Sequence, residues 1–178
     1  MAVNSFSSKI IFLCFLFISP LFLSNVFGVK EYDLVNKVCN KQEDVKFCLN
    51  VLKSDVGSKF ATKVKVLAKI SVNVARINST ATLSQFQRVK RGPPGLLKSL
   101  RKCITLYYNV VFLLKDCFKE KECLGTIFDI HFAGDQVKGC QGVADVNGAH
   151  DSIITPANDS TLKFLLLSES LAKLMCRS

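Results

Sequence analysis

Residues 95–117 read GLLKSLRKCITLYYNVVFLLKDC, and this segment gives the clearest indication of how the chain folds. Its apolar residues recur at spacings of three or four, as they do along one face of an α-helix, with polar residues between them. The apolar positions are Leu96, Leu100, Cys103, Tyr107, Val111 and Leu114. From residue 110 to 114 the helix is apolar all round. We therefore expect it to lie at the centre of a helical bundle, with Cys103 joining it covalently to a second helix.

The first 28 residues have the layout of a secretory signal peptide. Lys9 precedes the apolar run IIFLCFLFI, and the segment ends in small residues at Gly28. Ser19-Pro20 interrupts the run well short of the roughly 20 residues that a membrane span needs. We expect residues 1–28 to be removed. The remaining residues 29–178 then form one secreted, extracellular domain that has no membrane attachment after cleavage.

The charge of the remaining chain favours acidic partners. Lys9 is the only charge removed, so 24 − 1 = 23 basic and 14 acidic residues remain, a formal net charge of +9. Outside the cell, acidic polysaccharide, an acidic patch on a protein and an anionic membrane surface are candidates. Nucleic acid is disfavoured because the lysines are spread along the chain without a recognised binding motif. The lysines also fit a simpler role, which is to keep a helical surface soluble.

Cysteine usage agrees with export. Cys14 leaves with the signal peptide, and the odd number that remains leaves at least one cysteine outside intramolecular disulfides. The seven are Cys39, Cys48, Cys103, Cys117, Cys123, Cys140 and Cys176. The chain lacks C-x-x-C, C-x-C and Cys-Cys, which disfavours zinc ribbons and thioredoxin-type sites.

The first part of the secreted chain, residues 29–59, consists of short amphipathic segments interrupted by Asp and Gly. Cys39 and Cys48 are nine residues apart, which suits two short helices folded back on each other and joined by one bridge. The next stretch alternates like a β-strand at 63–66 and 70–74, and it is rich in β-branched residues. Yet a helical stripe runs from Phe60 without Gly or Pro far beyond an ordinary strand length. We expect a helix that reaches Phe86 or beyond.

The rest of the chain predicts three more helical segments. The turn RGPPG at 91–95 cannot continue a helix, so the helices on either side of it should be antiparallel neighbours. A further stripe covers 127–144, and Thr155-Pro156 has the chemistry of a helix start. The last helix is expected to direct these residues toward the core: Leu162, Leu165, Leu166, Leu171 and Ala172. Four long helices thus follow a helical hairpin, an all-α fold.

Two questions about side chains stay open at this level. Cys117 and Cys123 point away from each other in a continuous helix, so a third bridge between them requires the helix to break. The sequence leaves open whether this pair forms and which of Cys117, Cys123 and Cys176 stays unbridged. Asn78 and Asn158 each begin a glycosylation sequon, Asn78-Ser79-Thr80 and Asn158-Asp159-Ser160.

Catalytic and metal-binding patterns are weak in this chain. His131 and His150 are far apart and have no carboxylate or cysteine at ligand spacing, which disfavours a metal site. His150-Asp151 resembles the catalytic dipeptide of secreted phospholipases, but no preceding cysteine or Gly-rich calcium loop accompanies it. No nucleophile elbow or phosphate loop is present. We therefore expect a binding protein that needs no cofactor.

Several quoted segments together resemble a known family. VCNKQEDVKFCLNVLKSD, LAKISVNVARINST, LRKCITLYYNVVFLLKDC, VKGCQ and SIITPANDSTLKFLLLSESLAKL resemble, in order and spacing, the plant invertase and pectin methylesterase inhibitors. The specific features are C-x8-C near the start, C-x3-Y at Cys103, a cysteine 37 residues further on, and S-x-x-T-x-x-N before the last helix. The resemblance covers nearly the whole secreted chain.

The resemblance implies an up-down four-helix bundle at residues 60–178 preceded by a helical hairpin at 29–59. It implies the bridges Cys39–Cys48 and Cys103–Cys140, the second joining the second and third bundle helices. Members of the family are stoichiometric, noncovalent inhibitors that lay bundle helices or a helix connection across the active-site cleft of a cell-wall or vacuolar carbohydrate enzyme. The resemblance therefore implies a secreted, apoplastic inhibitor, with the vacuole as the alternative location.

The chain departs from the family pattern in two places. Gln42 and Val45 replace the usual threonine and proline between the first two cysteines. The Pro-Lys-Phe motif that invertase inhibitors can present is absent, and its nearest counterpart is the stretch 118–127. This absence favours pectin methylesterase over acid invertase as the partner. A bundle that only binds acidic pectin or signals is a second class of function, and a hydrolase using His150 and Asp151 is a third.

Overall fold

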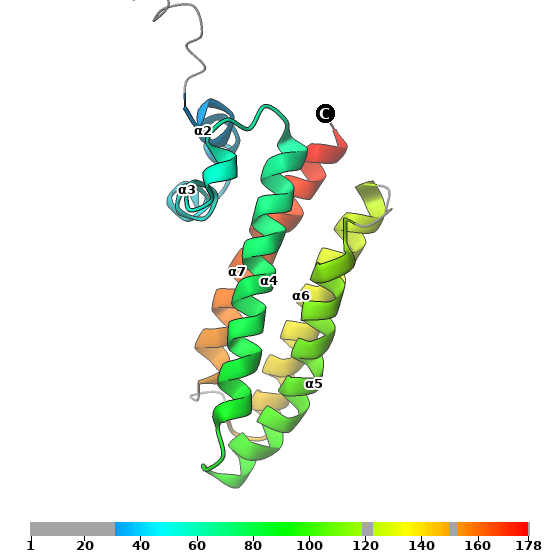
Figure 1. Cartoon of the computed structure of the whole chain (residues 1–178). Coiled ribbons are helices and arrows are strands. Elements are labelled where there is room, and N and C mark those ends of the chain that lie inside the picture. Colours follow the sequence, from blue (N-terminus) through cyan, green and yellow to red (C-terminus); the bar gives the residue numbers. More distant parts are fainter. Residues whose placement is uncertain (1–30, 119–122, 150–152, 178) are drawn as a thin grey trace, which may run out of the picture.

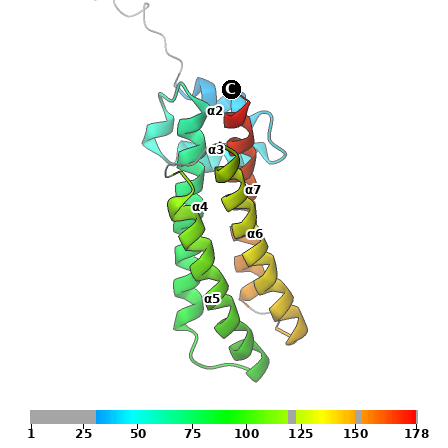
Figure 2. The same cartoon turned by 90° about the vertical axis from the view of Figure 1, so that its right-hand side faces the viewer.

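The computed structural model describes residues 31–118, 123–149 and 153–177, and every regular element in these ranges is helical. The short helices α2 (Asp33–Cys39) and α3 (Val45–Lys53) precede a 3₁₀ turn, η1 (Val56–Ser58). Four long helices follow, α4 (Val64–Arg88), α5 (Pro94–Asp116), α6 (Cys123–Val146) and α7 (Ile154–Cys176). They lie side by side with alternating direction, and α2 and α3 sit at one end (Figure 1, Figure 2). The predicted all-α class is confirmed, whereas the expected signal peptide lies outside the described residues.

The stretch that alternates like a strand is the first half of α4. The helix begins at Val64, after Lys63 in an extended conformation, and so starts later than the expected Phe60. Leu67, Ala68 and Ile70 are buried, whereas Lys65 and Lys69 are exposed. Burial of the helical stripe therefore overrides the modest preference of β-branched residues for strands.

The four long helices form a ring in which each packs against two neighbours. The contacting pairs are α4 with α5, α5 with α6, α6 with α7, and α7 with α4. The expectation that 95–117 lies at the centre of the bundle is therefore wrong. Val110 and Leu114 of α5 are buried between the helices, but Phe112 is 66% exposed. The apolar residues of α5 thus supply both a core face and part of the outer surface.

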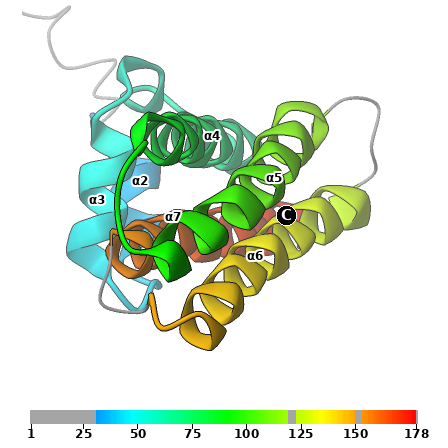
Figure 3. The same ribbon diagram turned by 90° about the horizontal axis from the view of Figure 1, so that it is seen from below.

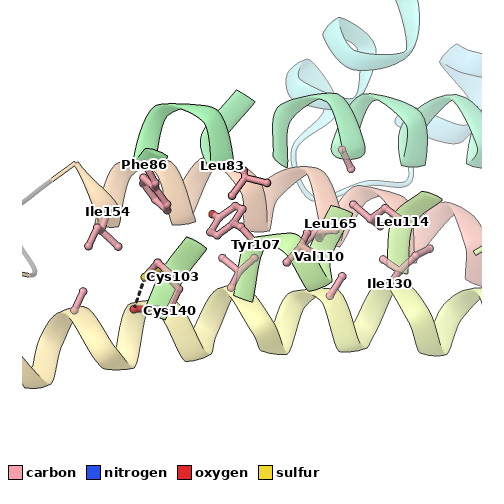
Figure 4. Close-up of a cluster of buried hydrophobic side chains, with 14 of the residues drawn as sticks. Leu83, Phe86, Cys103, Tyr107, Val110, Leu114, Ile130, Cys140, Ile154 and Leu165 are labelled. Carbon is pink, nitrogen blue, oxygen red and sulfur yellow. Dashed lines mark hydrogen bonds between the residues drawn. A yellow bond between two sulfur atoms is a disulfide. The ribbon is translucent and has the colours of Figure 1, made fainter. Parts of the chain in front are cut away.

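The interior of the ring is filled by large apolar side chains from all four helices. Leu83, Phe86, Tyr107, Ile130 and Leu165 are among the buried residues of this core (Figure 4). The rings of Phe86 and Tyr107 meet edge to face, with their centroids 5.2 Å apart. Such aromatic pairs add about 0.5–1.5 kcal/mol beyond the area that they bury.

A network of polar side chains crosses this apolar core. The hydroxyl of Tyr107 donates to Oδ1 of Asn158 at 2.9 Å and lies 3.2 Å from Oγ1 of Thr161. Thr161 Oγ1 lies 3.0 Å from Oδ1 of Asn78, and Asn158 Nδ2 donates to Oε1 of Gln141 at 3.0 Å. Since Asn78 belongs to α4, Tyr107 to α5 and Gln141 to α6, these bonds connect α7 to each of the other three long helices.

Three disulfides cross-link the helices. Cys39–Cys48 joins α2 to α3, and Cys103–Cys140 joins α5 to α6, with Cα atoms 5.5 and 4.8 Å apart. These are the two bridges that the family resemblance implies. The third is Cys123–Cys176, with Cα atoms 5.6 Å apart.

The bridge between Cys117 and Cys123, which the sequence left open, is not formed, because Cys123 pairs with Cys176. Cys123 is the first residue of α6 and Cys176 is the last residue of α7, and these antiparallel helices bring the two cysteines to the same end of the bundle. Cys117 follows α5, is buried and lies outside the three disulfides. Its carbonyl accepts a hydrogen bond of 2.7 Å from the hydroxyl of Thr126.

The hairpin packs against the first half of α4 and the second half of α7 through a second apolar cluster. This cluster contains Val35 and Leu52 of the hairpin, Leu67 of α4, and Leu167 and Leu171 of α7. Two expectations for α7 are wrong. Leu166 is exposed because it falls on the outer side of the helix, and the helix begins at Ile154, so Thr155 lies inside its first turn and not at the cap.

The disulfide assignment can be checked directly. Peptide mapping under non-reducing conditions should recover Cys123 linked to Cys176 and an alkylatable Cys117 after denaturation. Because the bridge closes a segment with a sequence separation of 53, Cys176→Ser should lower the free energy of unfolding by up to about 4 kcal/mol. A peptide containing Cys117 linked to Cys123 would contradict the assignment.

The polar network predicts that removing a single oxygen atom, the hydroxyl of Tyr107, lowers the stability of the protein markedly. Tyr107→Phe should destabilise the protein by about 1–3 kcal/mol in urea unfolding, because it leaves buried polar partners unsatisfied. The control Tyr108→Phe should change stability by no more than about 0.5 kcal/mol, since the hydroxyl of Tyr108 is on an exposed side chain. Equal effects of the two variants would contradict a stabilising role for the network.

The burial of the Tyr107 hydroxyl also predicts that the protein loses stability at alkaline pH. Burial raises the pKa of Tyr107 from 10.0 to about 12, against the opposing effect of the hydrogen bond with Thr161. The unfolded chain releases this proton first, so the stability that Tyr107 contributes is fully present below about pH 10 and declines as pH rises toward 12. The stability difference between the wild type and Tyr107→Phe should therefore shrink over that range. A difference that is constant with pH would contradict the raised pKa.

Candidate protein-binding face

The hairpin covers one side of the bundle and leaves the opposite side open. Seen along the bundle axis, α2 and α3 lie beside α4 and α7, whereas α5 and α6 lie on the other side (Figure 3). The aromatic contact between Phe47 of α3 and Phe164 of α7, with centroids 5.0 Å apart, helps to hold the hairpin there. The outer surface of α5 and α6 is thus available to a partner.

Large apolar side chains gather on this outer surface. Phe112 of α5 is 66% exposed, and on α6 Leu124, Phe128 and Phe132 are 73%, 66% and 46% exposed. Leu124, Phe128 and Phe132 follow at intervals of four, so they lie along one side of α6. The rings of Phe128 and Phe132 stack with their centroids 6.1 Å apart. We call these four residues the aromatic face.

The packing of α5 against α6 places the exposed apolar residues of the two helices at the same height along the bundle axis. The side-chain amides of Asn109 and Gln136 bond across the two helices at 3.2 Å. One turn further toward the α5–α6 connection lie Phe112 on α5 and Phe132 on α6. Because Cys103–Cys140 links the same two helices covalently, this register is fixed.

Such a surface is expensive to leave in water. Burying a Leu or Phe side chain that was exposed is worth about 1.5–3 kcal/mol, so a partner that covered the aromatic face would gain several times this amount. Exposed groups of aromatic residues mark protein interaction sites, where aromatic side chains often dominate the binding energy. The face is therefore suited to binding another protein.

Charged side chains border the aromatic face on its α7 side. His131 lies 3.8 Å through Nε2 from Oδ2 of Asp135 and 3.7 Å through Nδ1 from Oε1 of Glu169 on α7. The expectation that His131 has no carboxylate at ligand spacing is therefore wrong, because Asp135 follows four residues later on the same helix. Lys173 contacts the same Glu169 carboxylate at 2.6 Å. In the described part of the chain, no group of three or more His, Cys, Asp and Glu side chains is placed to hold a metal ion. His150 and Asp151 lie outside the described residues.

The two sequon asparagines differ in burial. Asn158 is 1% exposed, and its amide nitrogen, the atom to which a glycan would attach, donates to Gln141. The structure thus argues against glycosylation of Asn158 in the folded protein. Asn78 is half-buried, with its oxygen beside Thr161, and its glycosylation stays a prediction.

The aromatic face could not be recognised from the sequence pattern. Phe112 lay within the stretch read as enclosed, and Phe128 and Phe132 lie outside the apolar stripe through Ile127 and Ile130 that marks the core side of α6. The available indication was an excess of apolar residues, since α6 has more large side chains than one buried face accommodates.

The chain is thus a helical bundle with three disulfides and an exposed aromatic face on α5 and α6. A sequence model of the family "Plant invertase/pectin methylesterase inhibitor" matches residues 33–139, more than half of the chain. The chain belongs to this family, whose members are inhibitors, and the resemblance described from its sequence motifs is confirmed. No curated protein sequence matches the chain significantly.

Two solved structures show the same fold. One is "mutant form A of a pectin methylesterase inhibitor from Arabidopsis", with a TM-score of 0.65 and 19% identity over 79% of this chain and 95% of that one. The other is a pectin methylesterase inhibitor from Arabidopsis thaliana, with a TM-score of 0.59 and 17% identity over 82% of this chain and 97% of that one. At these identities the similarity establishes the fold.

The buried position of Asn158 predicts the glycosylation pattern. Secreted material should carry any N-linked glycan at Asn78 and none at Asn158, as read by enzymatic deglycosylation in ¹⁸O water and mass spectrometry. Thr80→Ala removes the Asn78 sequon at an exposed position and should remove all N-linked glycan mass. Detection of a glycan at Asn158 would contradict the placement of that side chain in the core.

Proposed function

We propose that this protein is a secreted inhibitor of a plant cell-wall pectin methylesterase, which it blocks by forming a noncovalent 1:1 complex. The observation that carries the proposal is the aromatic face on α5 and α6, held in register by Cys103–Cys140. Family membership supports an inhibitor of the pectin methylesterase or invertase type. A rigid apolar surface loses little conformational entropy on binding, which favours a stable complex.

The proposed mechanism is steric exclusion. The aromatic face packs on the rim of the enzyme's cleft, the bundle covers the entrance, and substrate cannot enter. No bond in the inhibitor is cleaved or formed in this scheme, and no cofactor takes part. Acid invertase, in the cell wall or the vacuole, is the alternative target. The absence of Pro-Lys-Phe between α5 and α6 favours pectin methylesterase.

Secretion is part of the same proposal. The first 28 residues supply the signal peptide, and the three disulfides suit an oxidising compartment outside the cytosol. None of the described helices is long and apolar enough to span a membrane.

Inhibition assays with purified enzymes test the proposal. The secreted protein should inhibit a plant pectin methylesterase at near-equimolar concentration and near apoplastic pH, and acid invertase should be assayed in parallel. Replacing Phe112 and Phe128 together by Ala should raise the inhibition constant by about 30-fold or more, as expected for aromatic residues at the centre of an interface. Circular dichroism should show an unchanged fold, because both side chains are exposed.

A matched control uses an exposed phenylalanine elsewhere. Phe60, which is also exposed, precedes α4 at the hairpin end of the molecule, so Phe60→Ala should change the inhibition constant by less than about twofold. If the wild type inhibits neither enzyme, the proposed function is wrong. If it inhibits one of them and the double variant is equally potent, the aromatic face is not the inhibitory surface.

A further inference from the structure

The charges of this protein are unevenly distributed along the chain. Residues 56–115, which include α4, the following turn and nearly all of α5, contain twelve Lys and Arg residues and no Asp or Glu. All 14 acidic residues lie before or after this segment. The segment folds as one antiparallel pair of helices, so the charge segregation in the sequence becomes a segregation in space.

The highest density of positive charge is at the α4–α5 turn. Six exposed basic residues fall within positions 88–102, at the end of α4, in the turn and in the first turns of α5: Arg88, Lys90, Arg91, Lys98, Arg101 and Lys102. We call them the basic end. They lie at the opposite end of the bundle from the hairpin (Figure 1). Among the described residues, no carboxylate forms an ion pair with any of the six.

Few negative charges offset the basic end. Among the residues that the structure describes, the exposed acidic ones of the neighbouring elements at this end of the bundle are Asp145 of α6 and Asp159 of α7. The carboxylate of Asp145 accepts a hydrogen bond of 2.8 Å from Nε2 of Gln141. The local balance is therefore strongly positive, and this end of the molecule will attract polyanions.

The backbone that carries these charges is held in place. A Cβ atom on Gly95 would overlap the carbonyl oxygen of Asn147, so the start of α5 packs closely against the end of α6. The hydroxyl of Ser99 donates to the carbonyl of Val143 at 3.3 Å in the same region. Pro93 and Pro94 further restrict the turn. A surface that is already ordered loses less entropy on binding.

The types of side chain at the basic end favour one class of polyanion over the others. Positions 88–102 contain no aromatic residue, and no large hydrophobic side chain in this range is among the exposed ones. Stacking on nucleic-acid bases needs aromatic side chains, and insertion into a membrane surface needs exposed apolar ones. The basic end therefore fits a polymer that is recognised through its negative charges alone.

We propose that the basic end binds a polyuronate, namely the de-esterified pectin that a pectin methylesterase produces. The choice of polymer rests on the proposed function, because every methyl ester that such an enzyme hydrolyses leaves a carboxylate on the chain. Several fixed cations facing a row of carboxylates attract it additively, with a strong dependence on salt. Binding would hold the inhibitor where its target enzyme has already acted and raise its concentration there.

Retention on immobilised polygalacturonate tests the inference. The basic-end variant replaces Lys90, Arg91, Lys98 and Lys102 by Gln. The control variant replaces Lys37, Lys46, Lys63 and Lys65, which are exposed at the hairpin end, by Gln and removes the same number of charges. At moderate ionic strength the basic-end variant should lose affinity by about tenfold or more, and the control by no more than about threefold.

Three further measurements sharpen this test. Binding of the wild type should weaken steeply with added salt, and it should be much weaker on fully methyl-esterified pectin. Anionic phosphatidylserine vesicles and single-stranded DNA should bind more weakly than polygalacturonate at the same salt concentration. Equal loss of affinity in the two variants, equal binding to esterified pectin, or stronger binding to vesicles or DNA would each overturn the inference.

Inhibition assays separate this inference from the proposed function. Both charge variants should inhibit pectin methylesterase as the wild type does on a soluble, low-charge substrate, because neither set of residues belongs to the aromatic face. A protein that inhibits the enzyme but is not retained on polygalacturonate would overturn only the polyuronate site. A protein that is retained but inhibits neither enzyme would overturn the proposed function.

Discussion

The hydrogen bond from the hydroxyl of Tyr107 to Asn158 is the interaction on which the bundle geometry depends. Apolar contacts alone allow helices to slide or rotate with little change in buried area, whereas a buried polar group has few acceptable partners. The network around Tyr107 includes residues of all four long helices, so it is satisfied in one arrangement of the bundle. The same hydrogen bond joins two of the family motifs, because the Tyr of C-x3-Y donates to the Asn of S-x-x-T-x-x-N.

With the bundle geometry fixed, three parts of its surface have different properties: the side that the hairpin covers, the aromatic face and the basic end. The hairpin covers the side formed by α4 and α7, so the outward residues of α5 and α6 remain exposed and supply the aromatic face. Positive charge concentrates at the α4–α5 turn, at the end far from the hairpin. Because α5 runs from the basic end to the aromatic face, one helix connects the two surfaces that we assign to binding. Its disulfide to α6 keeps their relative position constant.

Much of the fold could be predicted from the sequence because its determinants are local. The periodicity of 95–117, the Gly-Pro-Pro-Gly turn and the length of the stripe after Phe60 each predict a helix or its end from neighbouring residues. The partner of Cys123 depends instead on which helix ends lie together, and this is a property of the whole bundle. The exposure of Phe112 and Leu166 was missed for a similar reason, since an apolar residue beside a buried stripe faces either a neighbour or water according to the packing. The burial of Asn158 also depends on tertiary contacts that the sequon does not encode.

We propose that a cross-linked bundle of fixed geometry binds its target enzyme through the outer side of α5 and α6. The most direct measurement is a crystal structure of the complex between the secreted protein and the pectin methylesterase that it inhibits. Our account predicts that Phe112, Phe128 and Phe132 are buried at the rim of the enzyme's cleft and that the Tyr107–Asn158 hydrogen bond is unchanged from the unbound protein. A complex in which the hairpin contacts the enzyme while the aromatic face stays exposed to solvent, or in which the four helices have rearranged, would contradict it.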